Sequence, residues 1–138
     1  MVLTVQALAE GDASGRALVL AEPLSFWGGL DVESGRIIDR SHPDRGTVVS
    51  GRILVMPGAR GSSSSSSVFA EAIRRGTGPA GVILAVADPI LTVGALVAQS
   101  LYGLYCPVVV CPIAPFRTGQ DLRLRVSRDE SAEVVILT

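Results

Sequence analysis

Three short apolar runs alternate with two segments of helical character, and this alternation limits the fold more than any other feature of the sequence. The runs are ILVM (53–56), GVILAV (81–86) and PVVVCPI (107–113), separated by segments 68–76 and 90–103. A continuous apolar run is typical of a strand that is buried on both faces. The order predicts a β-α-β-α-β unit, whose parallel strands are joined by right-handed crossovers.

Local signals define the ends of the two predicted helices. Segment 68–76 has apolar residues at helical spacing and ends at Gly76, a residue type that commonly terminates helices. The second helix is expected to begin after Asp88, a good N-cap, with Pro89 in the first helical position. It is expected to end near Gly103.

The two ends of the chain predict further β-structure. Segments 3–10 and 14–22 are interpreted as two strands around a turn, and 122–127 and 132–137 as two more. We therefore expect an α/β fold with a central parallel sheet, helices on one side and an antiparallel β layer on the other. No internal repeat or long linker divides the chain, so residues 1–138 are expected to form one domain.

Composition limits the classes of partner. Hydrophobic residues make up 48% of the chain and charged residues 18%, which indicates an extensive core or a face that lies against another protein. The net charge is −1, and there is no basic patch that would indicate nucleic-acid binding. Asp88 and Pro89 interrupt the most apolar stretch, 81–98, so no membrane span is expected. With no secretory signal and only two cysteines, the chain is expected to be cytoplasmic.

Six consecutive serines, 62–67, lie between a predicted buried strand and a predicted helix. Ligands bind beyond the carboxyl ends of parallel strands, and a helix start favours anions. Gly58 and Gly61 would let the backbone approach such a ligand. Three interpretations stay open on the residues alone: a structural cap and turn, an anion-binding loop, or a loop with a catalytic serine. The phosphate-loop and esterase serine patterns are both missing.

The residue types that most often bind metals give no metal-binding pattern. Cys106 and Cys111 flank a predicted buried strand at an odd offset, which points their side chains to opposite faces. Both are interpreted as core residues, and no metal site is predicted in this chain. His42 is the only histidine, and its position in a predicted turn favours a surface structural role.

Four segments together resemble the swivel domain of the aconitase X family. They are SFWGGLDVESGRIIDRSHP (25–43), GRILVMPGARGSSSSSSVFAEAI (51–73), ADPILTVGALVA (87–98) and PVVV (107–110). The similarity extends from about residue 12 to beyond residue 110, and the short chain resembles the separate small subunit of a two-subunit member. The resemblance implies a swivelling β/β/α domain and a hydro-lyase that works only with a large subunit. It also implies an iron–sulfur cluster or iron whose cysteine ligands belong to that large subunit.

The resemblance also implies a site in the serine run. The family's catalytic base is the first serine after the loop glycine, which is Ser62 after Gly61 in this sequence. Helix-start N–H groups would stabilise an alkoxide at Ser62, and Arg60 is either a second stabiliser or a solvated charge. Gly61, Ser63 and Ser64 are then the candidates for binding the substrate carboxylate. Residues 65–67 are expected to cap or start the helix.

Two segments outside the serine run have less specific interpretations. Phe26 and Trp27 are expected to anchor their loop to the core or to the large subunit rather than to line the active site. Asp39 and His42 are expected to brace the same loop or to contact the large subunit.

The resemblance implies two possible substrates. The pattern of segments 25–43 and 87–103 favours cis-3-hydroxy-L-proline, dehydrated to Δ1-pyrroline-2-carboxylate. The alternative is mevalonate 5-phosphate, dehydrated to trans-anhydromevalonate 5-phosphate. Two rival functions also stay open: a non-catalytic module that binds an anion or acts as a lid, and a purely structural subunit.

Overall fold

The structure is a computed structural model that describes residues 1–137. In that range the chain forms one continuous mixed sheet and three helices, of which α1 is a single kinked turn. The strands are β1 (Val2–Thr4), β2 (Gln6–Ala9), β3 (Gly11–Val19), β4 (Ile53–Met56), β5 (Gly81–Leu84), β6 (Val108–Val110), β7 (Asp121–Val126) and β8 (Ala132–Ile136). The helices are α1 (Phe26–Gly29), α2 (Ser65–Arg75) and α3 (Pro89–Tyr102).

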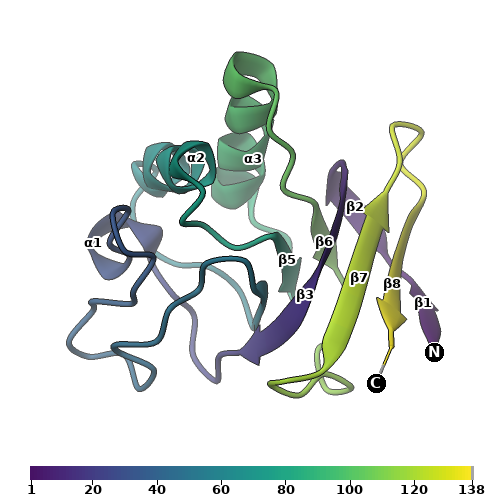
Figure 1. Ribbon diagram of the computed structural model, residues 1–138, viewed down its shortest axis with the longest axis horizontal. Coiled ribbons are helices and arrows are strands. Elements are labelled where there is room, and N and C mark those ends of the chain that lie inside the picture. The colour runs from purple at the N-terminus through teal and green to yellow at the C-terminus, as the bar shows by residue number, and fades with distance from the viewer. Residues whose placement is uncertain (138) are drawn as a thin grey trace.

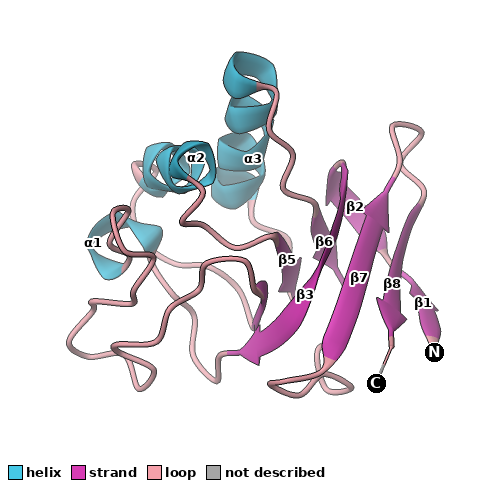
Figure 2. Cartoon of the chain, viewed as in Figure 1, coloured by secondary structure: helices cyan, strands magenta, loops and turns pink. Residues whose placement is uncertain are grey.

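The sheet has a parallel part and an antiparallel part, with the long strand β3 shared between them. The strand order is β1-β8-β7-β3-β4-β5-β6-β2 (Figure 2). Residues 17–19 of β3 pair in parallel with β4, whereas residues 11–16 pair antiparallel with β7. Only Val5 separates the two edge strands β1 and β2 along the chain. The two edges of the sheet therefore come together, and the sheet bends back on itself.

The bend creates three layers with two apolar cores. In Figure 1 the helices lie on one side of the parallel strands, and β7, β8 and β1 lie on the other. Leu54 and Met56 of β4 pack into the core beneath the helices, whereas Ile53 and Val55 pack into the core between the two β layers. This alternation explains why β4 is an uninterrupted apolar run, and it confirms the predicted arrangement of a parallel sheet between helices and an antiparallel layer.

The N-terminal strands depart from the sequence prediction. Segment 3–10 is not one strand in a hairpin but two short strands, of which β1 pairs with β8 and β2 pairs with β6. Gly11, which lies in the predicted turn between the two segments, is inside β3 and pairs with β7. The break at Val5 has a physical reason, because it lets one segment cover the open edges of both the parallel and the antiparallel parts.

The predicted helix ends are confirmed. Gly76 and Gly103 both adopt the left-handed conformation that closes a helix, with φ of 75° and 65°. Asp88 caps α3, since its carboxylate accepts a hydrogen bond from the Ile90 amide at 2.7 Å. Helix α2 begins at Ser65, earlier than the apolar spacing from Val68 indicates, and this confirms the expectation that residues 65–67 cap or start the helix.

The most apolar stretch of the sequence, 81–98, forms β5, a loop and part of α3. None of the helices within residues 1–137 is both long enough and apolar enough to cross a membrane.

Candidate functional site

The serine run begins in a loop at the carboxyl edge of the parallel strands. It follows β4, and the loops after β3 and β5 lie beside it. Leu24, in the loop after β3, forms a parallel bridge with Ala59, and the Ala85 amide after β5 donates to the Met56 carbonyl at 3.2 Å. This is the edge at which open α/β sheets bind their ligands.

The serines are ordered by hydrogen bonds and do not form a flexible linker. The Ser65 amide donates to the Ser62 carbonyl at 2.9 Å, which folds residues 62–65 into a turn that continues into α2. The Ser62 Oγ accepts a hydrogen bond from the Ser64 amide at 3.0 Å. Ser62, Ser63 and Ser64 are all exposed, whereas Ser65 is buried. The turn thus presents three adjacent hydroxyl groups to solvent at a helix start.

Residues 65–67 form the start of α2, which is one of the two roles that the sequence predicts for them. Ser64 occupies the N-cap position but makes no side-chain capping bond. The Ser65 Oγ instead accepts a hydrogen bond from the Trp27 amide at 3.0 Å, which links α2 to α1. Ser66 Oγ donates to the Ser63 carbonyl at 2.8 Å. The Ser65 hydroxyl therefore fixes the α1 loop, and the Ser66 hydroxyl fixes the turn before α2. The Ser64 amide has its hydrogen-bond partner in the Ser62 hydroxyl.

Gly61 is required by its surroundings. Its φ of +105° is in the region that favours glycine, and a Cβ added there would collide with the Ser25 side chain. Ser25 itself is fixed, because its Oγ donates to the Trp27 carbonyl at 3.0 Å. Gly58, by contrast, has open space where a Cβ would lie. Gly61 therefore packs the serine loop against the α1 loop, a role that adds to the ligand approach expected from the sequence.

Arg60 and Asp39 form an ion pair beside the loop, with the guanidinium nitrogen 3.6 Å from the carboxylate oxygen. The Asp39 carboxylate also accepts hydrogen bonds from the Ser41 amide at 2.9 Å and the Ser41 hydroxyl at 2.8 Å. These two bonds, with a smaller effect of the Arg60 charge, hold the pKa of Asp39 below its ordinary value. Arg60 is thus partly tethered, and the pair joins the serine loop to segment 39–41.

His42 is buried, so the expectation of a surface histidine is wrong. Its Nδ1 accepts from the Asp44 amide at 3.0 Å, which leaves Nε2 as the donor to the Glu22 carbonyl at 3.2 Å. The long segment between β3 and β4, residues 20–52, folds over the core, and the imidazole binds backbone groups of Glu22 and Asp44, which are far apart along it. This confirms the bracing role, because a ring held this way binds backbone on both sides.

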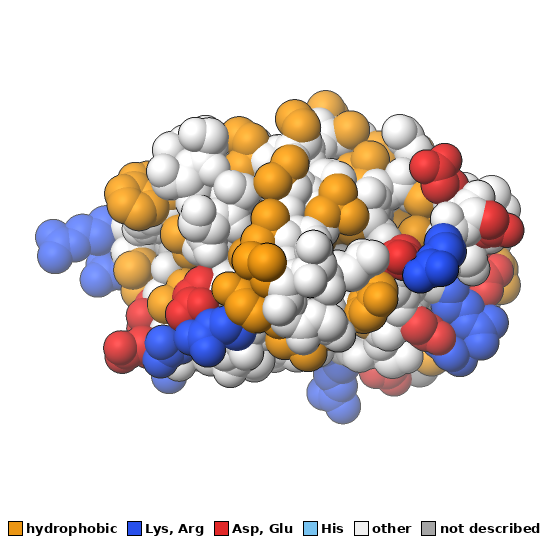
Figure 3. Space-filling model, turned by 90° about the horizontal axis from the view of Figure 1, so that it is seen from above, with side chains coloured by type: hydrophobic (Ala, Val, Ile, Leu, Met, Phe, Trp, Pro, Cys, Tyr) orange, Lys and Arg blue, Asp and Glu red, His pale blue; other side chains and the backbone are white. Residues whose placement is uncertain are grey.

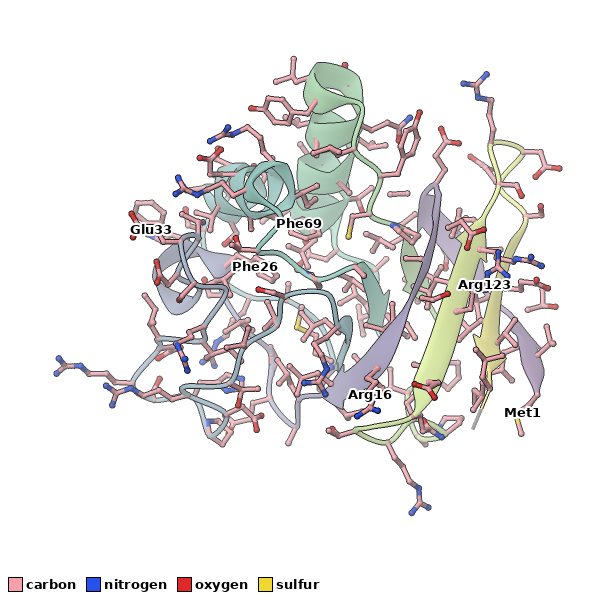
Figure 4. All side chains as sticks on the ribbon, in the orientation of Figure 1. Met1, Arg16, Phe26, Glu33, Phe69 and Arg123 are labelled. Atoms are coloured by element: carbon pink, nitrogen blue, oxygen red, sulfur yellow. The ribbon has the colours of Figure 1, made fainter. Side chains whose placement is uncertain are left out.

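The two aromatic residues of the α1 loop have different surroundings. Phe26 is fully buried, and its ring lies edge-on to Phe69 of α2 with centroids 5.0 Å apart (Figure 4). This contact confirms that Phe26 anchors the loop to the core. Trp27 is 59% exposed and lies next to the serine loop through its bond to Ser65.

A cavity of about 620 Å³ lies elsewhere, along β3, β7 and β8. Two ion pairs lie at it, because Arg123 (Figure 4) binds Asp12 at 2.8 Å and Arg125 lies 3.4 Å from Glu133, and Glu130 lines it as well. The Arg123 hydrogen bond lowers the pKa of Asp12. Because these ion pairs satisfy one another, we place the candidate site at the serine loop and not at this cavity.

The cysteines are structural. Cys106 lies in the core beneath the helices and Cys111 in the core between the β layers, as their odd offset predicts. Burial raises the pKa of the Cys106 thiol to about 12 and also raises the pKa of Cys111. No group of three or more His, Cys, Asp or Glu side chains that could hold a metal ion exists among the described residues. The residues present do not fit an iron centre.

We expect Cys106 to resist alkylation in the folded protein. Its thiol is buried and stays protonated until the pH approaches 12, and the thiolate is the reactive form. Iodoacetamide at pH 8 should label Cys106 at least about 100-fold more slowly in buffer than in denaturant, measured by mass spectrometry of peptides. The raised pKa also means that the protonated thiol favours the folded state at neutral pH. Its contribution to the free energy of unfolding falls as the pH rises from about 9 toward 12. Rapid labelling of Cys106 in buffer would contradict this assignment.

Several contacts of the site have no signal in the sequence. The contact of Gly61 with Ser25, the bond of Ser65 to Trp27 and the Asp39–Arg60 pair join segments that are far apart in the chain. A charged pair separated by about twenty residues has no characteristic spacing, so sequence patterns did not identify it. The candidate residues Gly61, Ser62, Ser63 and Ser64 are brought together by one turn, as their adjacency requires.

Comparison with protein families matches the aconitase X swivel domain over residues 2–135. The chain is 44% identical over 135 residues to the cis-3-hydroxy-L-proline dehydratase of Pseudomonas aeruginosa, covering 93% of this chain and 23% of that protein. It is 39% identical over 98 residues to the phosphomevalonate dehydratase small subunit of Methanothermobacter thermautotrophicus, covering 71% and 75% of the two chains. The chain therefore spans less than a quarter of the length of the first of these relatives.

A solved structure has the same fold. Aconitase X of Thermococcus kodakaraensis in its holo-form superposes with a TM-score of 0.86 at 31% identity, covering 100% of this chain and 99% of that one. The strand order and the two-layer β arrangement described above are thus those of a known domain.

Proposed function

This chain belongs to the aconitase X swivel-domain family, and from that premise we propose that it is the small subunit of an iron-dependent hydro-lyase. In this proposal the chain supplies Ser62 as the base that removes the proton next to the substrate carboxylate. The observation that carries the assignment is the position of Ser62. It is exposed at the carboxyl edge of the parallel strands, and its Oγ accepts a hydrogen bond from a helix-start amide.

The reaction requires removal of a proton and of a hydroxyl group from neighbouring carbons. Cis-3-hydroxy-L-proline and mevalonate 5-phosphate both carry a hydroxyl on the third carbon and a proton on the carbon next to the carboxylate. The base takes that proton, the C–H electron pair forms the new double bond, and the hydroxyl leaves as water with a second proton. For cis-3-hydroxy-L-proline the first product is an enamine, which becomes Δ1-pyrroline-2-carboxylate when the ring nitrogen loses a proton and the third carbon gains one. Ser62 needs to act on the first of these events only.

A serine hydroxyl is a weak base unless its anion is stabilised. The Ser64 amide donates to the Ser62 Oγ at 3.0 Å, and the positive end of the α2 dipole lies at the same turn. Both effects favour negative charge on Ser62 Oγ. Arg60 is engaged by Asp39 at 3.6 Å, so its charge contributes less than a free guanidinium would.

The residues around Ser62 have a supporting role in this proposal. Gly61, Ser63 and Ser64 are exposed, and the amides of Gly61 and Ser63 and the hydroxyls of Ser63 and Ser64 offer hydrogen-bond donors for a carboxylate, whereas the Ser64 amide donates to Ser62. Placement of these donors at a helix start suits an anion. We assign substrate carboxylate binding to this group.

The hydro-lyase would need a second chain. The small-subunit names of several relatives support a large-subunit partner, and the Pseudomonas relative carries a segment like this chain within a much longer polypeptide. We assign the iron or iron–sulfur centre to that large subunit. The described part of this chain has no group of side chains suited to hold it.

The preferred substrate is cis-3-hydroxy-L-proline, because the 44% identity to the Pseudomonas enzyme extends over 93% of this chain. Mevalonate 5-phosphate is the second candidate. The similarity to the Pyrococcus abyssi phosphomevalonate dehydratase small subunit supports it, since that chain is matched over 92% of its length at 36% identity.

The test combines this chain with the large-subunit homologue from the same organism, anaerobically and with iron. We expect dehydration of cis-3-hydroxy-L-proline, measured as formation of Δ1-pyrroline-2-carboxylate, and no turnover by either chain alone. A well-formed, iron-loaded complex that dehydrates only mevalonate 5-phosphate would favour the second substrate. A complex that dehydrates neither compound contradicts the hydro-lyase assignment for both.

A further inference from the structure

Helix α3 has an outer face without charge. No charged residue and no histidine occurs between Asp88 and Arg117, a span that includes all of α3 and the loop after it. Large hydrophobic side chains are exposed along this span, including Leu101 at 68% and Tyr105 at 51%. We define the α3 face as Val93, Leu96 and Leu101 on the outer side of the helix, together with Leu104 and Tyr105 in the loop after it.

The α3 face is not the side of the helix that packs in the core. Leu91, Ala95 and Ala98 are buried, and Gly94 lies so close to Phe69 that a Cβ would crowd it. A helix with one buried side normally has a polar outer side. Helix α2 follows this rule, because Glu71, Arg74 and Arg75 form ion pairs on its surface. The outer side of helix α3 therefore carries no charge and several exposed apolar side chains, with Ser100 as its exposed polar residue, and packing within this chain does not explain this composition.

Figure 3, which views the molecule from above, shows hydrophobic side chains gathered across the middle of this surface, where α3 lies in Figure 1. Most charged side chains in the same view lie toward its two ends, and one basic side chain lies at its lower middle edge. A contiguous exposed apolar patch of this kind marks an interaction site on a protein surface.

The α3 face is continuous with the candidate site. Strands β4 and β5 are paired neighbours, so the loops that follow them lie side by side, and Val86 in the second loop is 66% exposed. A Cβ on Gly94 would lie 2.8 Å from the Ser66 carbonyl, so α3 crosses the first turn of α2. On the other side of the serine loop, Trp27 is exposed as well. Apolar groups therefore flank the exposed serines on two sides.

We propose that the α3 face docks on the large hydro-lyase subunit, with Trp27 and Val86 at the edge next to the serine loop. This inference rests on the proposed function, because a base on this chain must reach a substrate held by the partner. The Pseudomonas relative supports a permanent partner, since a segment similar to this chain makes up only 23% of it. Permanent interfaces are the ones that carry little charge and much apolar surface.

The test uses full-length variants and the large-subunit homologue. Leu96→Glu and Leu101→Glu place a carboxylate on the α3 face, at side chains that are already 45% and 68% exposed. Leu137→Glu is the matched control, because Leu137 is 59% exposed at the other end of the chain. We expect the Kd for the large subunit, measured by calorimetry, to rise on the order of 100-fold for the α3 variants and less than about 3-fold for the control. Equal Kd values for all three would overturn the proposal.

Three further measurements separate this proposal from the proposed function. Unchanged melting temperatures show that each variant is folded. If the wild-type complex dehydrates its substrate and the α3 variants still bind normally, the docking surface is wrong and the function stands. If the α3 variants fail to bind but the wild-type complex has no activity, the function is wrong and the docking surface stands. The wild-type chain could also form a homodimer that Leu96→Glu converts to a monomer. If binding of the large subunit is then unchanged, the α3 face binds a second copy of this chain, and the proposal is contradicted.

Discussion

Replacing Ser62 with alanine is expected to lower the turnover of the reconstituted complex by roughly 10²- to 10⁴-fold, the range that general bases contribute. The substrate should still bind with a similar affinity, because Gly61, Ser63 and Ser64 remain in place. Formation of the complex should also be unchanged, since the change removes one small exposed side chain. Steady-state kinetics with the preferred substrate, together with calorimetric binding of the large subunit, provides both readouts.

The Ser62 Oγ also accepts the Ser64 amide, so the alanine variant loses a structural bond as well as a base. Loss of a hydrogen bond at a helix start costs about 1 kcal/mol of stability. Ser62→Thr keeps a hydroxyl at the same place and should keep that bond, so the two variants separate the roles. Ser67→Ala is a second control, because Ser67 is exposed one turn further into α2. It should retain wild-type turnover.

The two rival functions predict other outcomes for Ser62→Ala. An anion-binding loop that does no chemistry predicts a weaker affinity for the substrate with turnover at saturation unchanged. A purely structural subunit predicts almost no change in either quantity. A large loss of turnover at constant affinity is the result that supports a base, and the other two results contradict it.

The central layers could be predicted because their signal is local and repeated. Strands β4 and β5 are buried on both faces, so every residue in them is apolar or glycine, and this continuity is visible in the sequence. The helix ends at Gly76 and Gly103 and the cap at Asp88 each depend on one residue type with a clear conformational reason. The odd sequence offset of Cys106 and Cys111 also predicted correctly that they lie in separate cores, because successive side chains of a strand point to opposite faces.

The N-terminal strands could not be predicted because their partners are far away in the sequence. Strand β1 pairs with β8 at the other end of the chain, and β2 pairs with β6, so the break at Val5 depends on how the sheet closes. A local pattern of alternating apolar residues fits a hairpin equally well. The pairing that wins is the one that covers both open edges of the sheet.

The candidate site was predictable in position but not in its supports. A strand, a glycine and a polar run before a helix together indicate the carboxyl edge of a sheet, and the serine loop lies there. Its supports come from the long segment before β4, where Asp39 holds Arg60 and the buried His42 binds backbone carbonyl and amide groups. A buried imidazole in a turn has no sequence signature, because burial depends on how that segment folds over the core.

Gly61→Ala is the second variant for which we expect a large effect. The new methyl group collides with the Ser25 side chain, and the residue must also keep a φ of +105° that only glycine adopts easily. The loop must therefore shift, which moves Ser62. A displacement of about 1 Å at a reacting group costs about 100-fold in rate, so we expect turnover to fall by roughly that factor. The free energy of unfolding should fall by about 1–3 kcal/mol.

Three matched variants divide the Gly61 effect into its causes. Gly58→Ala lies in the same loop, with open space around the new methyl group, and should leave turnover unchanged. Gly119→Ala has a similar φ of +95° and open space, so it should lose stability from backbone strain without losing activity. In the double variant Gly61→Ala/Ser25→Gly the colliding Oγ and Cβ atoms are gone. It should regain most of the turnover but only part of the stability, because the collision is removed and the backbone strain remains. Turnover in the double variant no higher than in Gly61→Ala would show that contact with Ser25 does not position the serine loop.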